Sequence, residues 1–347
     1  MTDDGVHLID RFELPAGYSA RPYAGPSDHA EMARVLTDQR RAAGAPELVT
    51  AEDLDPAYQH LTDCDPHLDI AMIECGGELA AYCRTAFALM DDGGLDLIPL
   101  APISDAHRSR VLFDALTDAT EVHLQKWTER EPTSAATAIR YRTYAGHPGP
   151  GQPPTGEASW LEARGYEATE WSAVLRRPHL DDVPSLPLPD GIELRPAREV
   201  DLRTIVVAHC EAFRGEWDFA EPTEKDYSFL LDNPWRDETL WQVAWDGDEV
   251  VGQVKPFIIH TENEQEGYLR GYAEFISTHA DYRNQGIAKA LLARALIALR
   301  ERGMTEAVLG VDTNNPGGAF QLYTGLGFEL ESYEAVYTRT FDHASTI

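Results

Sequence analysis

Positive charge is scarce in this sequence of 347 residues, in which 29 lysines and arginines stand against 59 aspartates and glutamates. The formal net charge of −30 would repel nucleic-acid phosphates and anionic membrane surfaces, so both are poor partners. The excess of carboxylates is compatible with attraction of a cationic amine substrate and with ordinary solvation of the surface. We favour solvation, because a strongly charged surface needs no further explanation.

Cysteines and long apolar runs are also limited. The four cysteines form no CxxC pair and no His/Cys cluster at zinc spacing, so the sequence predicts no metal site and cysteines that remain thiols. No apolar run approaches the roughly 20 residues of a membrane span. The acidic start Met-Thr-Asp-Asp-Gly is not followed by the apolar segment of a secretory signal. We therefore expect a cytoplasmic globular protein, long enough for about two domains.

A proline-rich stretch divides the chain near its middle. Residues 178–191 contain four prolines and predict an extended linker. Similar landmarks occur in the same order on both sides: a short strand before a helix, a hairpin with a glycine turn, and a glycine followed by an aromatic residue. They are Tyr18–Pro22 with Ile192–Pro196, Ile73–Ala80 with Ala244–Val251, and Tyr166 with Phe328. This order predicts two copies of one α/β domain, at 1–177 and 192–347.

The second copy contains a motif suited to an anion. Residues 268–278 predict a strand, and the apolar spacing in 287–302 predicts a helix that ends at Gly303. The turn between them reads Arg-Asn-Gln-Gly-Ile-Ala, residues 283–288. Such a turn presents unpaired backbone N–H groups and the positive end of the helix dipole, which suits a pyrophosphate. The alternative is a solvent-facing turn that only caps the helix.

Further landmarks follow the helix. Residues 307–312 predict a buried strand, and the next segment reads Asn-Pro, then Ala-x-x-Leu-Tyr-x-x-x-Gly-Phe, ending at Phe328. This order resembles motifs A and B of the GNAT N-acetyltransferases. Two such domains in one chain resemble the mycothiol synthase-like proteins of actinobacteria. The resemblance implies an α/β (α+β) fold with two tandem GNAT-like domains, each a mixed, mostly antiparallel sheet flanked by helices.

The resemblance also implies a site for acetyl-CoA. The backbone of the turn would hold the pyrophosphate, and the backbones of Ile276 and Thr278 would bind the pantetheine arm as an added strand does at a sheet edge. Asn315 would lie near the thiol end of the cofactor. The residues of the turn are Arg283, Asn284, Gln285, Gly286, Ile287 and Ala288.

Acetyl transfer to an amine requires a base for the amine and an acid for the departing thiolate. Tyr323 matches the family's tyrosine that protonates the thiolate. Glu274, within the strand before the turn, is our candidate base, and burial of its face would raise its pKa. A salt-bridged or edge-exposed glutamate is the alternative interpretation of Glu274, and a core tyrosine that of Tyr323.

The acceptor pocket is predicted at the first helices of the second copy. Glu216, Trp217 and Asp218 combine carboxylates with an aromatic ring and could hold a cationic amine by charge and cation–π contact. A loop anchored by its tryptophan is the alternative.

The first copy lacks the same features. Leu161 aligns with Tyr323, and residues 99–112, where the anion-binding turn should lie, contain no glycine. We expect little CoA binding there, and a structural role or a wall of the acceptor site for this domain.

Three hypotheses follow for the whole chain. The first is an enzyme that transfers an acetyl group from acetyl-CoA to the primary amine of a small molecule. The second is a non-catalytic acyl-CoA-binding or regulatory module. The third is a purely structural pair of α/β domains. CoA binding separates the third from the others, and thiol release with amines separates the first two.

Overall fold

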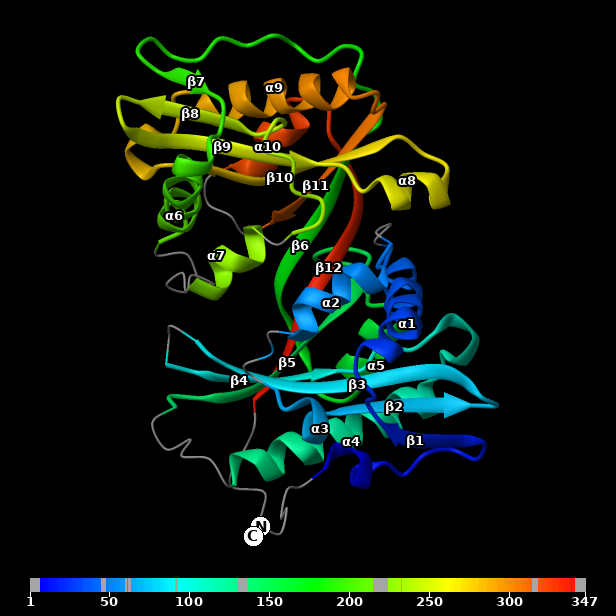
Figure 1. Ribbon diagram of the computed structural model, residues 1–347. Helices are drawn as coiled ribbons and strands as arrows, with labels where there is room; N and C mark the ends of the chain where they lie inside the picture. The colour runs from blue at the N-terminus through cyan, green and yellow to red at the C-terminus, as the bar shows by residue number, and fades with distance from the viewer. Residues whose placement is uncertain are drawn as a thin grey trace. The chain divides into compact units, whose positions relative to one another are not determined.

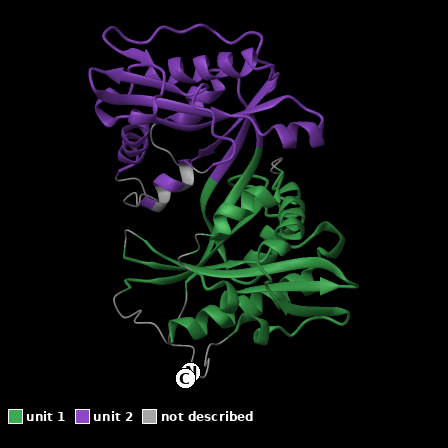
Figure 2. Cartoon of the chain, viewed as in Figure 1, with its two compact units in different colours: residues 1–171, 332–347 green, residues 172–331 purple. Residues whose placement is uncertain are grey.

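The computed structural model describes residues 7–44, 48–59, 61, 64–90, 93–129, 136–214, 224–231, 233–313 and 318–340 (Figure 1). The chain divides into two compact units (Figure 2). Unit 1 combines residues 1–171 with 332–347, and unit 2 comprises residues 172–331.

The sheet of unit 1 is mixed. Antiparallel pairs join β1 to β2, β2 to β3, β3 to β4 and β5 to β12, whereas β4 and β5 are parallel. The residues of β6 that belong to this unit follow β12 in the strand order. The strands are β1 (Tyr18–Pro22), β2 (Ile70–Cys75), β3 (Glu78–Leu89), β4 (Leu95–Leu100), β5 (Ile139–His147), β6 (Glu167–Arg177) and β12 (Glu329–Thr340).

Alternation along the strands of unit 1 gives each face its own core. In β2, Ile70 and Met72 pack in one cluster with α1, whereas Ala71 and Ile73 pack in another with α4. The helices are α1 (His29–Ala42), α2 (Ala51–Gln59), α3 (Pro66–Asp69), α4 (Arg110–Thr128) and α5 (Gly156–Ala163).

Unit 2 repeats this plan. Its strand order is β6-β11-β10-β9-β8-β7, with β10 and β11 parallel and the other pairs antiparallel. Its strands, apart from β6, are β7 (Glu193–Arg195), β8 (Gln242–Asp246), β9 (Glu249–Phe257), β10 (Arg270–Thr278) and β11 (Glu306–Asp312). Its helices are α6 (Leu202–Ala212), α7 (Glu224–Leu231), α8 (His260–Glu266), α9 (Ile287–Glu301) and α10 (Ala319–Thr324).

Two glycines bring α9 close to the sheet of unit 2. A Cβ atom at Gly252 would lie 2.7 Å from Ile287 Cγ2, and one at Gly271 would lie 2.6 Å from Leu299 Cδ2. Both glycines therefore allow the helix to pack directly on the strand backbones. Helix α9 covers one face of β8, β9 and β10, and α6 covers the other (Figure 1).

The predicted fold class and the predicted repeat are confirmed. The compact units, however, do not simply follow chain order. Strand β6, which ends the first half of the sequence, pairs with β11 in unit 2, and β12, which ends the second half, pairs with β5 in unit 1. The boundaries 1–177 and 192–347 remain a prediction from the repeat. Residues 178–191 form no helix or strand, although Leu180 and Val183 are buried. Within the described residues, no helix is both long and apolar enough to cross a membrane.

Candidate functional site

The two parallel strands of unit 2 stay paired over a short distance only. Their register extends from Arg270 opposite Glu306 to Tyr272 opposite Val308, and no further. Strand β10 then contains an irregularity between Glu274 and Ser277, in which Phe275 adopts a φ of 52°. Beyond this bulge, β10 still pairs with β9 on one side, while its ladder with β11 has ended on the other.

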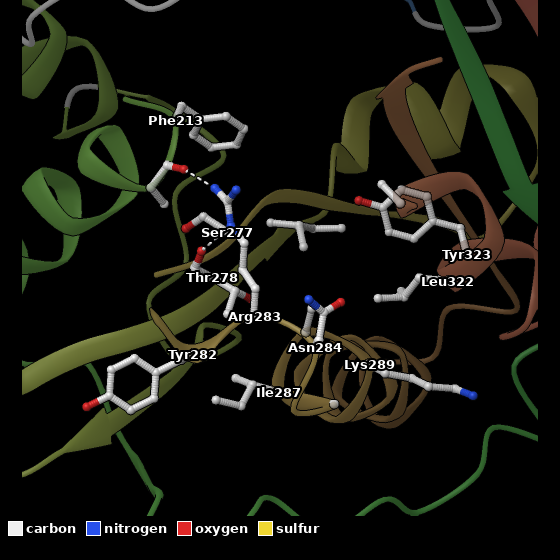
Figure 3. Close-up of a pocket in the computed structure, with 15 residues that line it drawn as sticks. Phe213, Ser277, Thr278, Tyr282, Arg283, Asn284, Ile287, Lys289, Leu322 and Tyr323 are labelled. Carbon is white, nitrogen blue, oxygen red and sulfur yellow. Dashed lines mark hydrogen bonds between the residues drawn. The ribbon is translucent and has the colours of Figure 1, made fainter. Parts of the chain in front are cut away.

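A cavity of about 500 Å³ opens beside this end of β10 (Figure 3). Its size is typical of small-molecule sites. Three segments that the sequence singled out meet there: the end of β10, the turn before α9, and helix α10. Lining residues include Ile276, Thr278, Asn284, Gly286, Ala288 and Tyr323.

The N-terminus of α9 is open toward this cavity. Asn284 and Gly286 adopt positive φ angles of 62° and 83°, which asparagine and glycine tolerate best. Gly286 occupies the N-cap position and brings no capping side chain, so the first N–H groups of α9 have no partner from a cap. In unit 1, by contrast, Ser109 Oγ accepts a hydrogen bond from Leu112 N–H, 3.4 Å away, at the start of α4. The N-terminus of α9 is therefore the better anion site of the two.

Arg283 links the turn to its surroundings. Its Nη2 atom donates a hydrogen bond to the carbonyl of Ala212, 2.6 Å away, at the end of α6. The side chain of Gln285 likewise donates to the carbonyl of Asp281, 3.3 Å away. Both side chains therefore hold the turn in place, and Arg283 also lines the cavity.

Tyr323 enters the cavity from α10. Its side chain is packed against Phe328 and only 7% exposed, and Figure 3 shows its hydroxyl directed toward the middle of the cavity. Burial, with a smaller contribution from Glu274, raises the pKa of Tyr323 well above that of a free tyrosine. The hydroxyl therefore stays protonated at neutral pH and can act as a donor.

Glu274 lies where the strands β10 and β11 lose their pairing. Its Oε1 atom accepts a hydrogen bond from the backbone N–H of Gly310 in β11, 2.7 Å away. The residue is half-buried, and its charge reaches Tyr323. The charge of Glu274 thus lies near the phenol of Tyr323, which lines the cavity, and the roles of base and acid remain predictions for these two residues.

Four predicted residues lie outside the part of the chain that the structure describes. They are Asn315, Glu216, Trp217 and Asp218.

The sequence reasoning missed a polar pair at the cavity wall, a half-buried histidine and a buried serine. His209 Nδ1 and Ser277 Oγ are 3.1 Å apart and share a hydrogen bond. Burial, and then the charge of Lys255, lowers the pKa of His209 to about 3, so its ring is neutral at physiological pH. The one available signal was a lysine, Lys255, within the strand 250–257, in which Gln253 is the other polar side chain.

Unit 1 has a cavity of about 320 Å³ lined by the ends of β4 and β5 and by α5. Leu161, which aligns with Tyr323, lines it and is 3% exposed. Unit 1 therefore has no tyrosine hydroxyl at the position that corresponds to Tyr323.

Comparisons with known proteins agree with this geometry. The family model described as "Acetyltransferase (GNAT) family" matches residues 206–328. The mycothiol acetyltransferase of Salinispora tropica is 32% identical over 307 residues, which cover 86% of this chain and 90% of that protein.

Solved structures support the fold. The GCN5-related N-acetyltransferase from Sphaerobacter thermophilus aligns with a TM-score of 0.67 and 22% identity, covering 94% of this chain and 96% of that one. A tandem GNAT protein from the clavulanic acid biosynthesis pathway aligns with a TM-score of 0.65 and 14% identity, covering 93% of this chain and 98% of that one.

The fold and the relatives define an enzyme of the acetyltransferase class with two tandem domains. The chain belongs to the GNAT family of N-acetyltransferases, and it is similar to the mycothiol acetyltransferases over most of its length.

Proposed function

We propose that the chain transfers an acetyl group from acetyl-CoA to the primary amine of a small molecule, in the cavity of unit 2. The observation that carries this proposal is the convergence on one cavity of the open N-terminus of α9, the unpaired edge of β10 and the hydroxyl of Tyr323. An anion, an extended arm and a proton donor are what acyl transfer from CoA needs at one place.

The residues of the cavity fit CoA. The backbone N–H groups at the start of α9 suit the pyrophosphate, and a Cβ atom at Gly286 would point into open space, where the anion has to approach. The turn residues Asn284 and Gln285 belong to the same site. The edge of β10 at Ile276 and Thr278 suits the amide groups of pantetheine.

Glu274 and Tyr323 would divide the proton transfers. The carboxylate of Glu274 accepts a proton from the attacking amine, as the new C–N bond forms at the carbonyl carbon. The hydroxyl of Tyr323 donates its proton to sulfur, as the C–S bond breaks. Asn315 remains our proposal for a neighbour of the thiol end. Glu216, Trp217 and Asp218 remain our proposal for contacts to the amine.

The test is a screen for thiol release. Purified protein is supplied with acetyl-CoA and a panel of small amines, and free CoA is measured against a control without amine. Amine-dependent release supports the proposal. Tight CoA binding without release for any amine would instead support a non-catalytic acyl-CoA-binding module.

We expect CoA to bind once per chain, because the first turn of α4 is capped by Ser109 and no glycine lies in residues 99–112. Isothermal titration calorimetry with CoA measures the stoichiometry. A value near two, or loss of binding after changes confined to residues 99–112, would show that unit 1 holds the cofactor.

Gly286→Val is expected to weaken CoA binding at least about tenfold, which corresponds to about 1.4 kcal/mol. The branched side chain would occupy the space through which the pyrophosphate approaches the backbone. Gly303→Val is the matched control, because Gly303 lies at the other end of α9 with a φ of 89°, and a Cβ atom there would meet nothing within 4 Å. Both variants carry a similar backbone strain of about 1–3 kcal/mol. Equal CoA affinity in the two folded variants would remove the turn from the site.

A further inference from the structure

A lysine side chain is buried in unit 2 without a counter-ion among the residues that the structure describes. Lys255, in β9, is 2% exposed. Within the described residues, its Nζ atom has no ion pair and no hydrogen bond; it faces the rings of Phe275 and Trp241, whose centroids are 5.0 and 5.6 Å away. Contact with aromatic rings compensates only part of the cost of removing an ammonium group from water. A bound anion would offset the remaining cost of keeping this buried amine charged.

A small recess adjoins this lysine. It has a volume of about 20 Å³ and room for about one water-sized group. Its lining is mostly aromatic and cationic, with Asn233 and Pro256 in addition, and none of the described residues that form it is a carboxylate. Arg236 lines it as well but is engaged by Glu238, 2.9 Å away, so Lys255 is the cation of this lining that has no ion pair with any described residue. The recess therefore suits one oxygen atom of a small anion.

The recess lies next to the candidate base. Glu274 is the direct partner of Lys255 in the antiparallel register of β9 and β10, and Phe275, which lines the recess, follows Glu274. Directly opposed residues have Cβ atoms about 4.5–5.5 Å apart. An acceptor with its amine at Glu274 therefore lies over the strand pair that also carries Lys255. In an α-amino acid, a single carbon separates the amine from the carboxylate.

We propose that Lys255 is the residue that selects acceptors carrying a carboxylate near their amine, as amino acids do, by binding that carboxylate in the recess. This inference rests on the proposed function, because it concerns the acceptor of the same reaction. The ammonium of Lys255 donates hydrogen bonds to the carboxylate, and the surrounding rings exclude water and strengthen this pair.

Proton uptake should accompany binding. Burial lowers the pKa of Lys255 to about 7, partly opposed by Cys210. In the part of the chain that the structure describes, the other titratable groups around it are His209 on α6, Glu274 on β10 and Arg236 before β8. A bound carboxylate favours the ammonium form and raises this pKa again. At pH 8, where the free amine is mostly neutral, binding of a carboxylate should therefore take up close to one proton.

The kinetic test uses matched acceptors and Lys255→Met, which keeps the length of the side chain but removes its charge. Phenylalanine, phenylalaninamide and 2-phenylethylamine, and similar sets from other amino acids, are compared by thiol release from acetyl-CoA. In whichever set is acetylated, the wild type should prefer the amine that carries a carboxylate about 10- to 100-fold in kcat/KM, mainly through a lower KM. Lys255→Met should lose this preference and keep its activity with the members that lack a carboxylate. Lys126→Met, at an exposed lysine in unit 1, is the matched control.

Calorimetry gives a readout that does not need turnover. Phenylacetate is titrated into the protein at pH 8 in two buffers that differ in ionisation enthalpy, and the difference gives the protons taken up. Uptake by the wild type and by Lys126→Met, but not by Lys255→Met, supports the anion site even if no amine is acetylated. Thiol release with equal kcat/KM for all members of a set, or uptake retained in Lys255→Met, would overturn it. Absence of thiol release with every amine, alongside intact uptake, would count against the proposed transfer reaction alone.

Discussion

Tyr323→Phe is expected to lower kcat by about two to four orders of magnitude and to leave the affinity for acetyl-CoA nearly unchanged. The substitution removes one oxygen, and the ring keeps its packing against Phe328. Without the hydroxyl, the tetrahedral intermediate must expel an unprotonated thiolate. Steady-state kinetics with a productive amine measures kcat, and calorimetry measures the affinity for acetyl-CoA. The deficit should shrink at high pH or with a better leaving thiol.

Tyr282→Phe is the matched control for this substitution. Tyr282 also lines the cavity, but its hydroxyl donates a hydrogen bond to Asp246, 2.9 Å away, and Figure 3 shows it directed away from Tyr323. The kcat of the Tyr282→Phe variant should stay within about threefold of the wild-type value. If Tyr323→Phe turns over at the wild-type rate with the same amine, Tyr323 is a packing residue and the acid must be sought elsewhere.

Glu274→Gln is expected to lower kcat/KM by about two to four orders of magnitude near neutral pH, because the amide cannot accept the proton of the amine. The amide oxygen can still accept the hydrogen bond from Gly310, so the contact between β10 and β11 is retained. As the pH rises, a growing fraction of the amine is already deprotonated, and the deficit should decrease. A pH series of kcat/KM for both proteins measures this.

Glu301→Gln serves as the control for the change of charge, because Glu301 is exposed at the end of α9. It should behave as the wild type across the pH series. A Glu274→Gln variant with a full kcat/KM at neutral pH would leave Glu274 with the structural role of joining two strands.

The elements around the site were predictable from local sequence. The apolar spacing of 287–302 predicted α9, which spans Ile287–Glu301, and Gly286 and Gly303 marked its two ends. The glycine turns of both hairpins are likewise present, at Gly76-Gly77 and at Gly247. These features depend on contacts between near neighbours in the chain, which a periodic pattern records directly.

Strand β6 pairs with β11 in unit 2, and β12 pairs with β5 in unit 1. This exchange of terminal strands between the two halves of the sequence could not be predicted from local patterns. Both are ordinary terminal strands of similar domains, and nothing in their own residues says with which copy they pair. The roles of Lys255 and His209 were unpredictable for the same reason, because their surroundings depend on the packing of α6 against β9 and β10. Tyr323 was found because a family motif marks its position, and Glu274 because it is the carboxylate within the strand before the turn. Their catalytic roles remain predictions.

The exchange also bears on the synthesis of the chain. Within unit 1, strand β5 pairs with β4 on one side and with β12 on the other, and β12 is reached only after all of unit 2. Until β12 is made, the outer edge of β5 offers unpaired N–H and C=O groups to any other strand nearby. The nascent chain is therefore most exposed to aggregation while only its first half has been made. The last step in the folding of unit 1 must wait for residues far downstream.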